Sequence, residues 1–171
     1  MVHKLLQLKT AHANRRSYTL GLLQAQVYRL LKHQTKDILD PYRINTLEWS
    51  LLGLVYESKD EGVRAIALSG ALLIDMPFVT LMVVKLEKRG FLKRSTDAED
   101  KRAKRIIITT KGKSFVDAVE TEVKIGIRPL LKGLSASELI TYITVLTKFK
   151  NNAASAELLK PVKDVPKHWR E

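Results

Sequence analysis

The fold is decided by residues 75–112, which read DMPFVTLMVVKLEKRGFLKRSTDAEDKRAKRIIITTKG. Asp75, followed two positions later by proline, predicts the start of a helix that Asp75 caps, and Gly90 predicts where that helix ends. The segments 91–95 and 105–109 are rich in residues that favour strands, and the segment between them is very polar. This stretch therefore predicts one helix followed by a two-stranded ribbon with a charged tip. Four apolar residues of the helix recur at helical spacing and should face the core: Val79, Met82, Val83 and Leu86.

The residues before this stretch predict two further helices. Asn45 with Glu48 three positions later is a capping pattern, and it predicts a helix that ends near Ser58. A polar turn leads to a short helix over 64–71, which lacks a serine or threonine cap, and then to a tight turn over 72–74. A short helix, a tight turn, a second helix and a cationic ribbon are the layout of a winged helix-turn-helix, in which one helix enters the major groove of DNA.

Long helices flank this region. Residues 17–39 place apolar side chains on one helix face. A second long helix starts at Thr110 and is interrupted at Pro129, and Ser135 with Glu138 predicts the capped start of a last helix. The apolar stripes of these helices fit either an intramolecular core or a dimer interface, and so elongated a pattern favours the dimer. The expected interface residues are Leu20, Leu23, Val27, Leu30, Phe115, Val119, Val123, Ile127, Leu139, Ile143 and Leu146.

We therefore expect a mainly α-helical fold with a small β-wing, of the α+β class, that combines a winged helix-turn-helix with a helical dimerisation domain. Residues 45–109 are the expected DNA-binding domain. The segments 17–44 and 110–152 are the expected dimerisation region. A basic N-terminal arm over 1–16 and a C-terminal arm over 153–171 complete the predicted organisation.

The composition limits the chemistry open to the chain. Its 171 residues include no cysteine, which excludes disulfides, cysteine-ligated zinc, Fe–S clusters and thiol chemistry, and which suits a reducing, cytoplasmic location. The histidines have no metal-ligand spacing, and a phosphate-binding loop pattern fails at Ile107, where a glycine is needed. We therefore expect no enzyme activity, no metal and no cofactor.

The charge is strongly positive and locally concentrated. The chain has 30 Lys and Arg against 18 Asp and Glu, a formal net charge of +12 and a pI of about 9.9. Residues 85–113 contain eleven cations and four acids, so a net +7 lies in one stretch. This balance favours a polyanionic partner, with nucleic acid ahead of an anionic membrane surface. Residues 65–84 are long enough to span a bilayer, but Asp75 near their middle splits them into two short helices, so we expect no membrane segment.

Several segments together resemble the MarR family of bacterial transcription regulators. They are KLEKRGF at 85–91, Arg94, DKRA at 100–103 and ITTKG at 108–112, in the family's order and spacing. The resemblance implies a homodimer that binds double-stranded DNA at a palindromic operator, as a repressor, with half-sites about one helical turn apart. It also implies release of the DNA when a small aromatic or anionic effector binds between the dimer and DNA-binding parts.

The resemblance also implies residue roles. Arg102 corresponds to the wing-tip arginine that enters the minor groove, and Asp100 corresponds to the carboxylate that holds its guanidinium. Leu81 and Val84 depart from similar members that carry a polar or arginine base reader, which leaves thymine methyl contacts or DNA shape as the means of readout. The expected DNA contacts are Met76, Pro77, Thr80, Leu81 and Lys85 on the recognition helix, and Arg94, Asp100, Lys101, Arg102, Lys104 and Arg105 in the wing.

An effector cleft has candidate lining residues in this sequence. Aromatic rings at Trp49, Tyr18 and Tyr42 suit an aromatic compound, and the cations Arg15 and Arg16 suit an anionic one. The same five residues also fit ordinary core and surface roles.

Two other functions fit the same sequence. A basic protein could bind nucleic acid by charge alone, without reading its sequence. The apolar outer face of the helix over 75–89 could instead dock a protein partner. A sequence-specific regulator binds its operator more tightly than other DNA, whereas a protein that binds by charge alone does not. The DNA affinity of a regulator should also depend on Arg102, whereas that of a protein-docking module should not.

Overall fold

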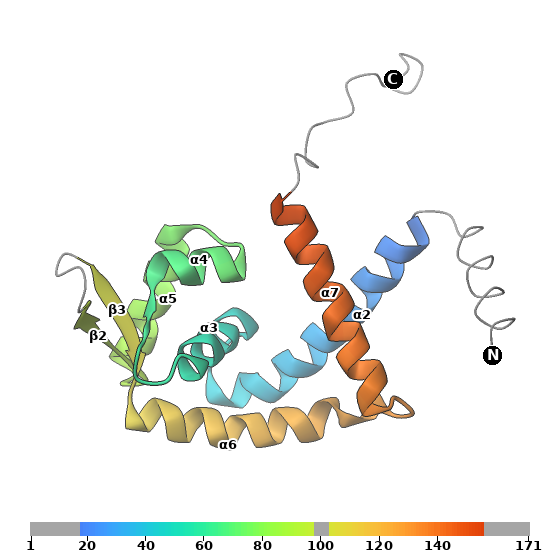
Figure 1. Ribbon diagram of the computed structural model, residues 1–171. Coiled ribbons are helices and arrows are strands. Elements are labelled where there is room, and N and C mark those ends of the chain that lie inside the picture. The colour runs from blue at the N-terminus through green and yellow to red at the C-terminus, as the bar shows by residue number, and fades with distance from the viewer. Residues whose placement is uncertain (1–17, 98–102, 156–171) are drawn as a thin grey trace, which may run out of the picture. The chain divides into compact units, whose positions relative to one another are not determined.

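The structure is a computed structural model that describes residues 18–97 and 103–155 (Figure 1). The described residues are mostly helical with one small antiparallel sheet, as the sequence predicts, and the sheet has three strands where the sequence predicts two. The chain divides into two compact units, residues 1–130 and 131–171. Each unit is described by itself below.

The first unit begins with two helices joined by a short bend. α2 (Tyr18–Leu39) is followed by the 3-10 turn η1 (Asp40–Tyr42) and by α3 (Thr46–Glu57). The predicted capping box of α3 is confirmed, because Glu48 N–H donates to Asn45 Oδ1 at 2.9 Å and Asn45 N–H donates to Glu48 Oε2 at 3.0 Å.

The helix-turn-helix consists of α4 (Ala65–Leu72) and α5 (Met76–Lys88). Leu73 makes the turn between them in a left-handed conformation, with φ of 54°. Asp75 has the extended backbone of an N-cap, but its side chain makes no capping hydrogen bond, contrary to the cap predicted from the sequence. The reason is local: Pro77 has no N–H to donate, and the N–H of Phe78 bonds to the backbone carbonyl of Asp75 at 3.0 Å.

The wing is a sheet with strand order β1-β3-β2. Its strands are β1 (Val63–Arg64), β2 (Leu92–Thr96) and β3 (Lys104–Ile108), and both pairings are antiparallel. The β2 and β3 ribbon is the predicted one, shifted by one residue in each strand. The sequence does not predict β1, because two residues are too short for an alternating pattern to be visible.

The core of the first unit lies where α3, α5 and the sheet meet the start of α6 (Thr110–Ile127). α5 turns its predicted inner face, Val79, Met82, Val83 and Leu86, into this core. α2 packs against α6, and Figure 1 shows α6 running along the lower side of this unit, below α3.

Three residues of α6 differ from their predicted dimerisation role. Val119 is fully buried, Val123 is buried, and the ring of Phe115 stacks on Phe91 with 4.3 Å between ring centroids. Phe115 and Ile127 both pack against the core. Val119 and Val123 therefore belong to the core of their own chain, and Phe115 and Ile127 are partly buried against it.

The second unit contains α7 (Ala136–Ser155), which follows the 3-10 turn η2 (Arg128–Leu131) where Pro129 predicts an interruption. The predicted capping box is confirmed: Ser135 N–H donates to Glu138 Oε2 at 2.8 Å, and Glu138 N–H donates to Ser135 Oγ at 3.3 Å. The helix extends to Ser155, beyond the predicted boundary at residue 152.

Among the described residues, no single helix is long and apolar enough to cross a bilayer. α4 and α5 would together meet the length and composition criteria, but the chain bends by 112° between them.

Candidate nucleic-acid interface

The outer face of α5 presents most of the predicted base-facing residues to solvent. Pro77, Thr80, Leu81 and Lys85 are exposed, and Met76 is half-buried. Leu81 is the most exposed large apolar residue of this helix, at 67%. α5 therefore has the free surface that a recognition helix needs.

The polar groups on this face already have partners within the chain. Thr80 Oγ1 donates to the carbonyl oxygen of Met76 at 3.0 Å, and Lys85 Nζ lies 2.6 Å from Glu48 Oε1. Glu48 is 2% exposed, so this buried carboxylate both caps α3 and anchors a lysine of α5. The sequence shows the capping role of Glu48, but no local pattern predicts a partner 37 positions away.

A buried carboxylate lies at the end of β2, where the β2–β3 ribbon meets its connecting loop. Asp97 is 1% exposed, and its Oδ2 accepts from Arg64 Nε at 2.8 Å and from Arg105 Nε at 2.7 Å. Arg105 Nη1 also donates to the carbonyl oxygens of Glu61 and Gly62, both at 3.3 Å. One buried carboxylate thus joins β1 and β3 next to the turn that precedes β1.

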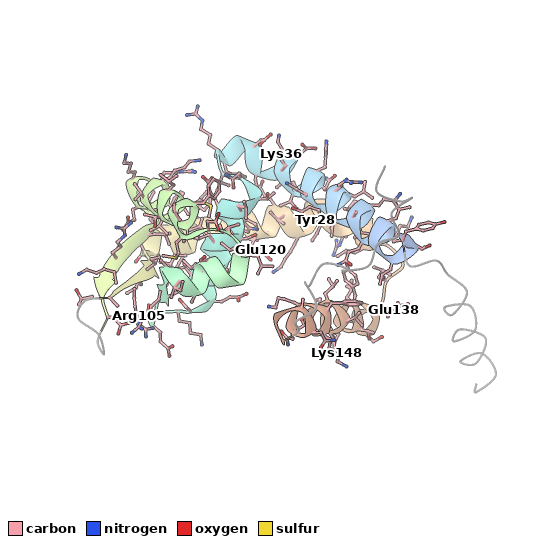
Figure 2. The ribbon with its side chains drawn as sticks, turned by 90° about the horizontal axis from the view of Figure 1, so that it is seen from above. Tyr28, Lys36, Arg105, Glu120, Glu138 and Lys148 are labelled. Carbon is pink, nitrogen blue, oxygen red and sulfur yellow. The ribbon has the colours of Figure 1, made fainter. Side chains whose placement is uncertain are left out.

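Arg105, a predicted phosphate contact, is bound within the chain. Its guanidinium is half-buried and paired with Asp97, so it also fixes the wing; Figure 2 labels Arg105. Sequence reasoning missed Asp97 as a buried anchor because an aspartate in a polar segment of mixed charge has no apolar pattern around it.

Two predicted phosphate contacts lie on the same face of the ribbon, beside α5. Arg94 on β2 pairs with Glu87 Oε2 at 3.3 Å, and Lys104 Nζ on β3 donates to Thr96 Oγ1 at 2.9 Å. Both are exposed. With Thr80 they line a hollow of about 240 Å³ between α5 and the sheet. The structure thus places one predicted DNA contact of α5, Thr80, on the same surface as two predicted DNA contacts of the wing, Arg94 and Lys104. Asp100, Lys101 and Arg102 lie outside the described residues.

A second functional arginine on the same unit was not singled out from the sequence. Arg89, at the end of α5, donates through Nη1 and Nη2 to the carbonyl oxygens of Arg43 and Tyr42 at 2.9 and 2.8 Å. Its guanidinium also lies 4.6 Å from the centroid of the Phe91 ring. Arg89 therefore ties the end of α5 to the bend between α2 and α3, and its two hydrogen-bond partners are distant from it in sequence.

The predicted dimerisation residues of α2 are exposed in the single chain. They are Leu20, Leu23, Val27 and Leu30. Further exposed rings at Tyr18 and Tyr28 extend the apolar surface of this helix, on which Figure 2 labels Tyr28. On α7, Ile143 is exposed, and Leu139 and Leu146 are half-buried. α2 thus carries large apolar side chains that its own unit does not cover.

An open hollow of about 460 Å³ lies where α2, α3, α4 and α6 meet. Trp49 and Tyr28 supply rings to its wall, and Lys32 supplies a cation. Of the predicted cleft residues, Trp49 lies here. Tyr42 instead contacts Phe115 edge-on, and a hydrogen bond with Glu122 raises the pKa of its phenol. Tyr18 is exposed and does not line this hollow, and Arg15 and Arg16 lie outside the described residues.

Across residues 18–97 and 103–155, no group of three or more histidine, aspartate or glutamate side chains is arranged to hold a metal ion.

Comparison with known proteins gives matches to both the sequence and the fold. Residues 44–104 match the model of the MarR family. CouR from Rhodococcus jostii RHA1, in a structure bound to p-coumaroyl-CoA, is 23% identical with a TM-score of 0.71, over 77% of this chain and 91% of that one. MepR from S. aureus, in a complex with DNA, is 25% identical with a TM-score of 0.65, over 81% of this chain and 99% of that one.

A third similar structure is a mutant of MarR from E. coli complexed with operator DNA. It is 23% identical with a TM-score of 0.65, over 77% of this chain and 93% of that one. The matched residues 44–104 contain the helix-turn-helix, β2 and the first residue of β3. The chain therefore carries a MarR-family domain in residues 44–104, within a winged-helix fold that it shares with MarR-family transcription regulators.

Proposed function

We propose that this protein is a sequence-specific DNA-binding transcription regulator that acts as a homodimer on a palindromic operator. The observation that carries the proposal is the exposed outer face of α5 beside the cations Arg94 and Lys104 of the wing. A helix of this length fits the major groove, and cations beside it fit the phosphates on either side. The MepR complex with DNA and the MarR complex with operator DNA support this assignment for the shared fold.

The charge distribution supports the same partner. The net +7 of residues 85–113 covers the end of α5, the ribbon and the start of α6. Each phosphate that such cations neutralise releases a counterion, which gives the binding its strength and its dependence on salt. In this proposal Arg102 enters the minor groove, Asp100 orients it, and Lys101 contacts the backbone.

The uncovered apolar side chains of α2 support the proposed dimer. In a single chain, water would contact the apolar side chains of Leu20, Leu23, Val27 and Leu30. Contact with a second copy of the chain would remove these side chains from water. Residues Leu139, Ile143 and Leu146 of α7 belong to the same proposed interface. A two-fold axis would then present two copies of α5, so half-sites should be about 10 base pairs apart from centre to centre.

We further propose that the protein is a repressor released by a small effector with aromatic and anionic character. The supporting feature is the hollow lined by Tyr28, Trp49 and Lys32, because rings and a cation there match such a compound. α2 and α3 both line the hollow. A compound in it would therefore touch the proposed dimerisation helix α2 and, through α3, the proposed DNA-binding domain. The structure of CouR with p-coumaroyl-CoA provides a precedent for an aromatic, anionic ligand on this fold.

A selection of random duplex DNA with the purified full chain tests the proposal. At about physiological salt, the enriched duplexes should share a palindrome whose half-sites are about one helical turn apart. If no sequence is enriched above the input pool, the protein binds DNA by charge alone and the proposal is wrong.

A further inference from the structure

The start of the recognition helix is apolar and open to solvent. Leu73 in the turn is 80% exposed, and on α5 itself Leu81 and Phe78 are 67% and 50% exposed. Phe78 and Leu81 are three positions apart, so their side chains are neighbours on one face of the helix. In helix-turn-helix proteins this N-terminal part of the second helix contacts the base edges.

The same helix offers few hydrogen-bonding groups to bases. Its sequence from Met76 to Lys88 contains no arginine, asparagine or glutamine, and lysine, which can also pair with guanine, occurs only as Lys85 and as Lys88 at the C-terminal end of the helix. The hydroxyl of Thr80 donates to its own helix backbone, and the ammonium of Lys85 pairs with the buried Glu48. Reading by hydrogen bonds is therefore not the chemistry that this face provides.

We propose that α5 reads its operator mainly through the C5-methyl groups of thymine, with Leu81 as the principal contact and Phe78 as its neighbour. This inference rests on the proposed function. Thymine is the only base that presents a methyl group in the major groove, and an apolar side chain gains free energy by covering it. A cytosine in the same place would lose water from its N4 amino group without a protein acceptor, so the contact also disfavours G·C pairs.

Charge favours duplex DNA over a protein as the occupant of this apolar patch. Arg94 and Lys104 line the hollow beside α5, and Lys88 is exposed at the end of the helix. A patch bordered by cations on its own helix and on the neighbouring ribbon suits a groove bordered by phosphates. The half-site under α5 should therefore be rich in A·T pairs.

The test uses the palindrome enriched from random duplexes, made once with thymine and once with deoxyuridine at the contacted positions. Uracil keeps every hydrogen-bonding group of thymine and lacks only the methyl. Each contacted methyl that is removed should weaken binding by the unmodified full chain about fourfold, and a symmetric pair should weaken it about fifteenfold. This comparison needs no protein variant.

Leu81→Ala then assigns the effect to its residue. The variant should bind the thymine duplex more weakly than the unmodified chain does, and it should bind the thymine and deoxyuridine duplexes with nearly equal affinity. Lys88→Ala is the matched control on the same helix. It should weaken binding to both duplexes alike and leave their ratio unchanged, because a phosphate contact does not distinguish the bases.

The outcomes separate this inference from the proposed function. A palindrome whose thymine and deoxyuridine forms bind the unmodified chain equally overturns methyl reading and leaves the operator function standing. Equal loss of the thymine preference in Leu81→Ala and Lys88→Ala also overturns the assignment to Leu81. Failure to enrich any sequence overturns the proposed function, and this inference with it.

Discussion

At the scale of single residues, the wing depends on Asp97. Its buried carboxylate accepts from Arg64 and Arg105, which come from different strands, and Arg105 in turn binds the carbonyl oxygens of the turn before β1. A buried charge is tolerated in a protein when hydrogen-bonded cations surround it. Asp97 therefore adds a buried polar link between β3 and the β1 residue that precedes α4.

Asp97→Asn should lower the free energy of unfolding by about 2 to 4 kcal/mol, because it keeps the size of the side chain and removes the charge that two guanidinium groups share. Urea denaturation of the full chain measures the change. The control is Asp60→Asn: Asp60 is exposed, and its Oδ1 lies 3.0 Å from Lys113 Nζ. That variant should change stability by about 0.5 kcal/mol or less. Equal effects of the two substitutions would contradict the anchoring role of Asp97.

At the scale of elements, the junction between β3 and α6 explains the ITTKG segment. Thr109 caps α6, because its side chain accepts from the N–H of Gly112 at 3.0 Å, and the same hydroxyl donates to the carbonyl oxygen of Gly90 at 2.7 Å. A Cβ atom on Gly112 would overlap the carbonyl oxygen of Phe91. Threonine and glycine are therefore needed for close packing between the end of α5 and the start of α6.

Gly112→Ala should destabilise the protein by about 1 to 3 kcal/mol, since the atom that it meets belongs to the backbone and cannot turn away. Gly53→Ala is the matched control within α3. A Cβ there meets nothing within 4 Å, so this variant should be more stable by about 0.5 to 1 kcal/mol. Thermal unfolding of both variants measures the two changes, and the same sign for both would contradict the close packing at Gly112.

The start of α7 carries a pH dependence of known sign. Hydrogen bonds from the backbone N–H and the hydroxyl of Ser135 hold the pKa of Glu138 below its ordinary value of 4.5. A lowered pKa means that this cap stabilises α7 at pH values above the ordinary pKa, and that the contribution is lost as the pH falls through the lowered one.

Carboxyl NMR titration of the full chain should find the pKa of Glu138 below 4.5, and Ser135→Ala should raise it toward that value. Thr141→Ala is the control, because the hydroxyl of Thr141 donates to the carbonyl oxygen of Ser137 and not to Glu138. A pKa of Glu138 that is the same in all three proteins would contradict the capping contact as its cause.

The parts of the fold that follow from local chemistry could be predicted from the sequence. The capping boxes at Asn45 and Ser135 and the inner face of α5 are patterns within a few neighbouring residues, and the structure confirms them. The side-chain cap at Asp75 fails because Pro77 removes the donor that it needs.

Features that join distant residues could not be predicted. The pairing of Lys85 with Glu48, the burial of Asp97 and the strand β1 each depend on which elements meet in space. The burial of Val119 and Val123 within their own chain could not be predicted either, because an apolar stripe on a helix has the same sequence pattern in a core and in an interface. Long-range pairing leaves no periodic signal in a single sequence.

At the scale of the whole molecule, the proposed dimer requires the apolar side chains of α2. Leu23→Glu should raise the dimer dissociation constant by about a hundredfold or more, because two-fold symmetry places the buried charge in the interface twice. Sedimentation equilibrium of the full chain measures it. Gln24→Glu adds the same charge to an exposed polar position one residue along the same helix and should have little effect. A dimer that tolerates both changes would contradict an interface through this face of α2.

The central claim is that this protein reads a DNA sequence and does not merely bind its charge. The most direct measurement compares the Kd of the unmodified chain for its selected palindrome with its Kd for a scrambled duplex of the same composition, at about 0.15 M salt. Our account predicts that the palindrome binds about a thousandfold more tightly, or better. A ratio near one, with both affinities falling equally as salt rises, would contradict it.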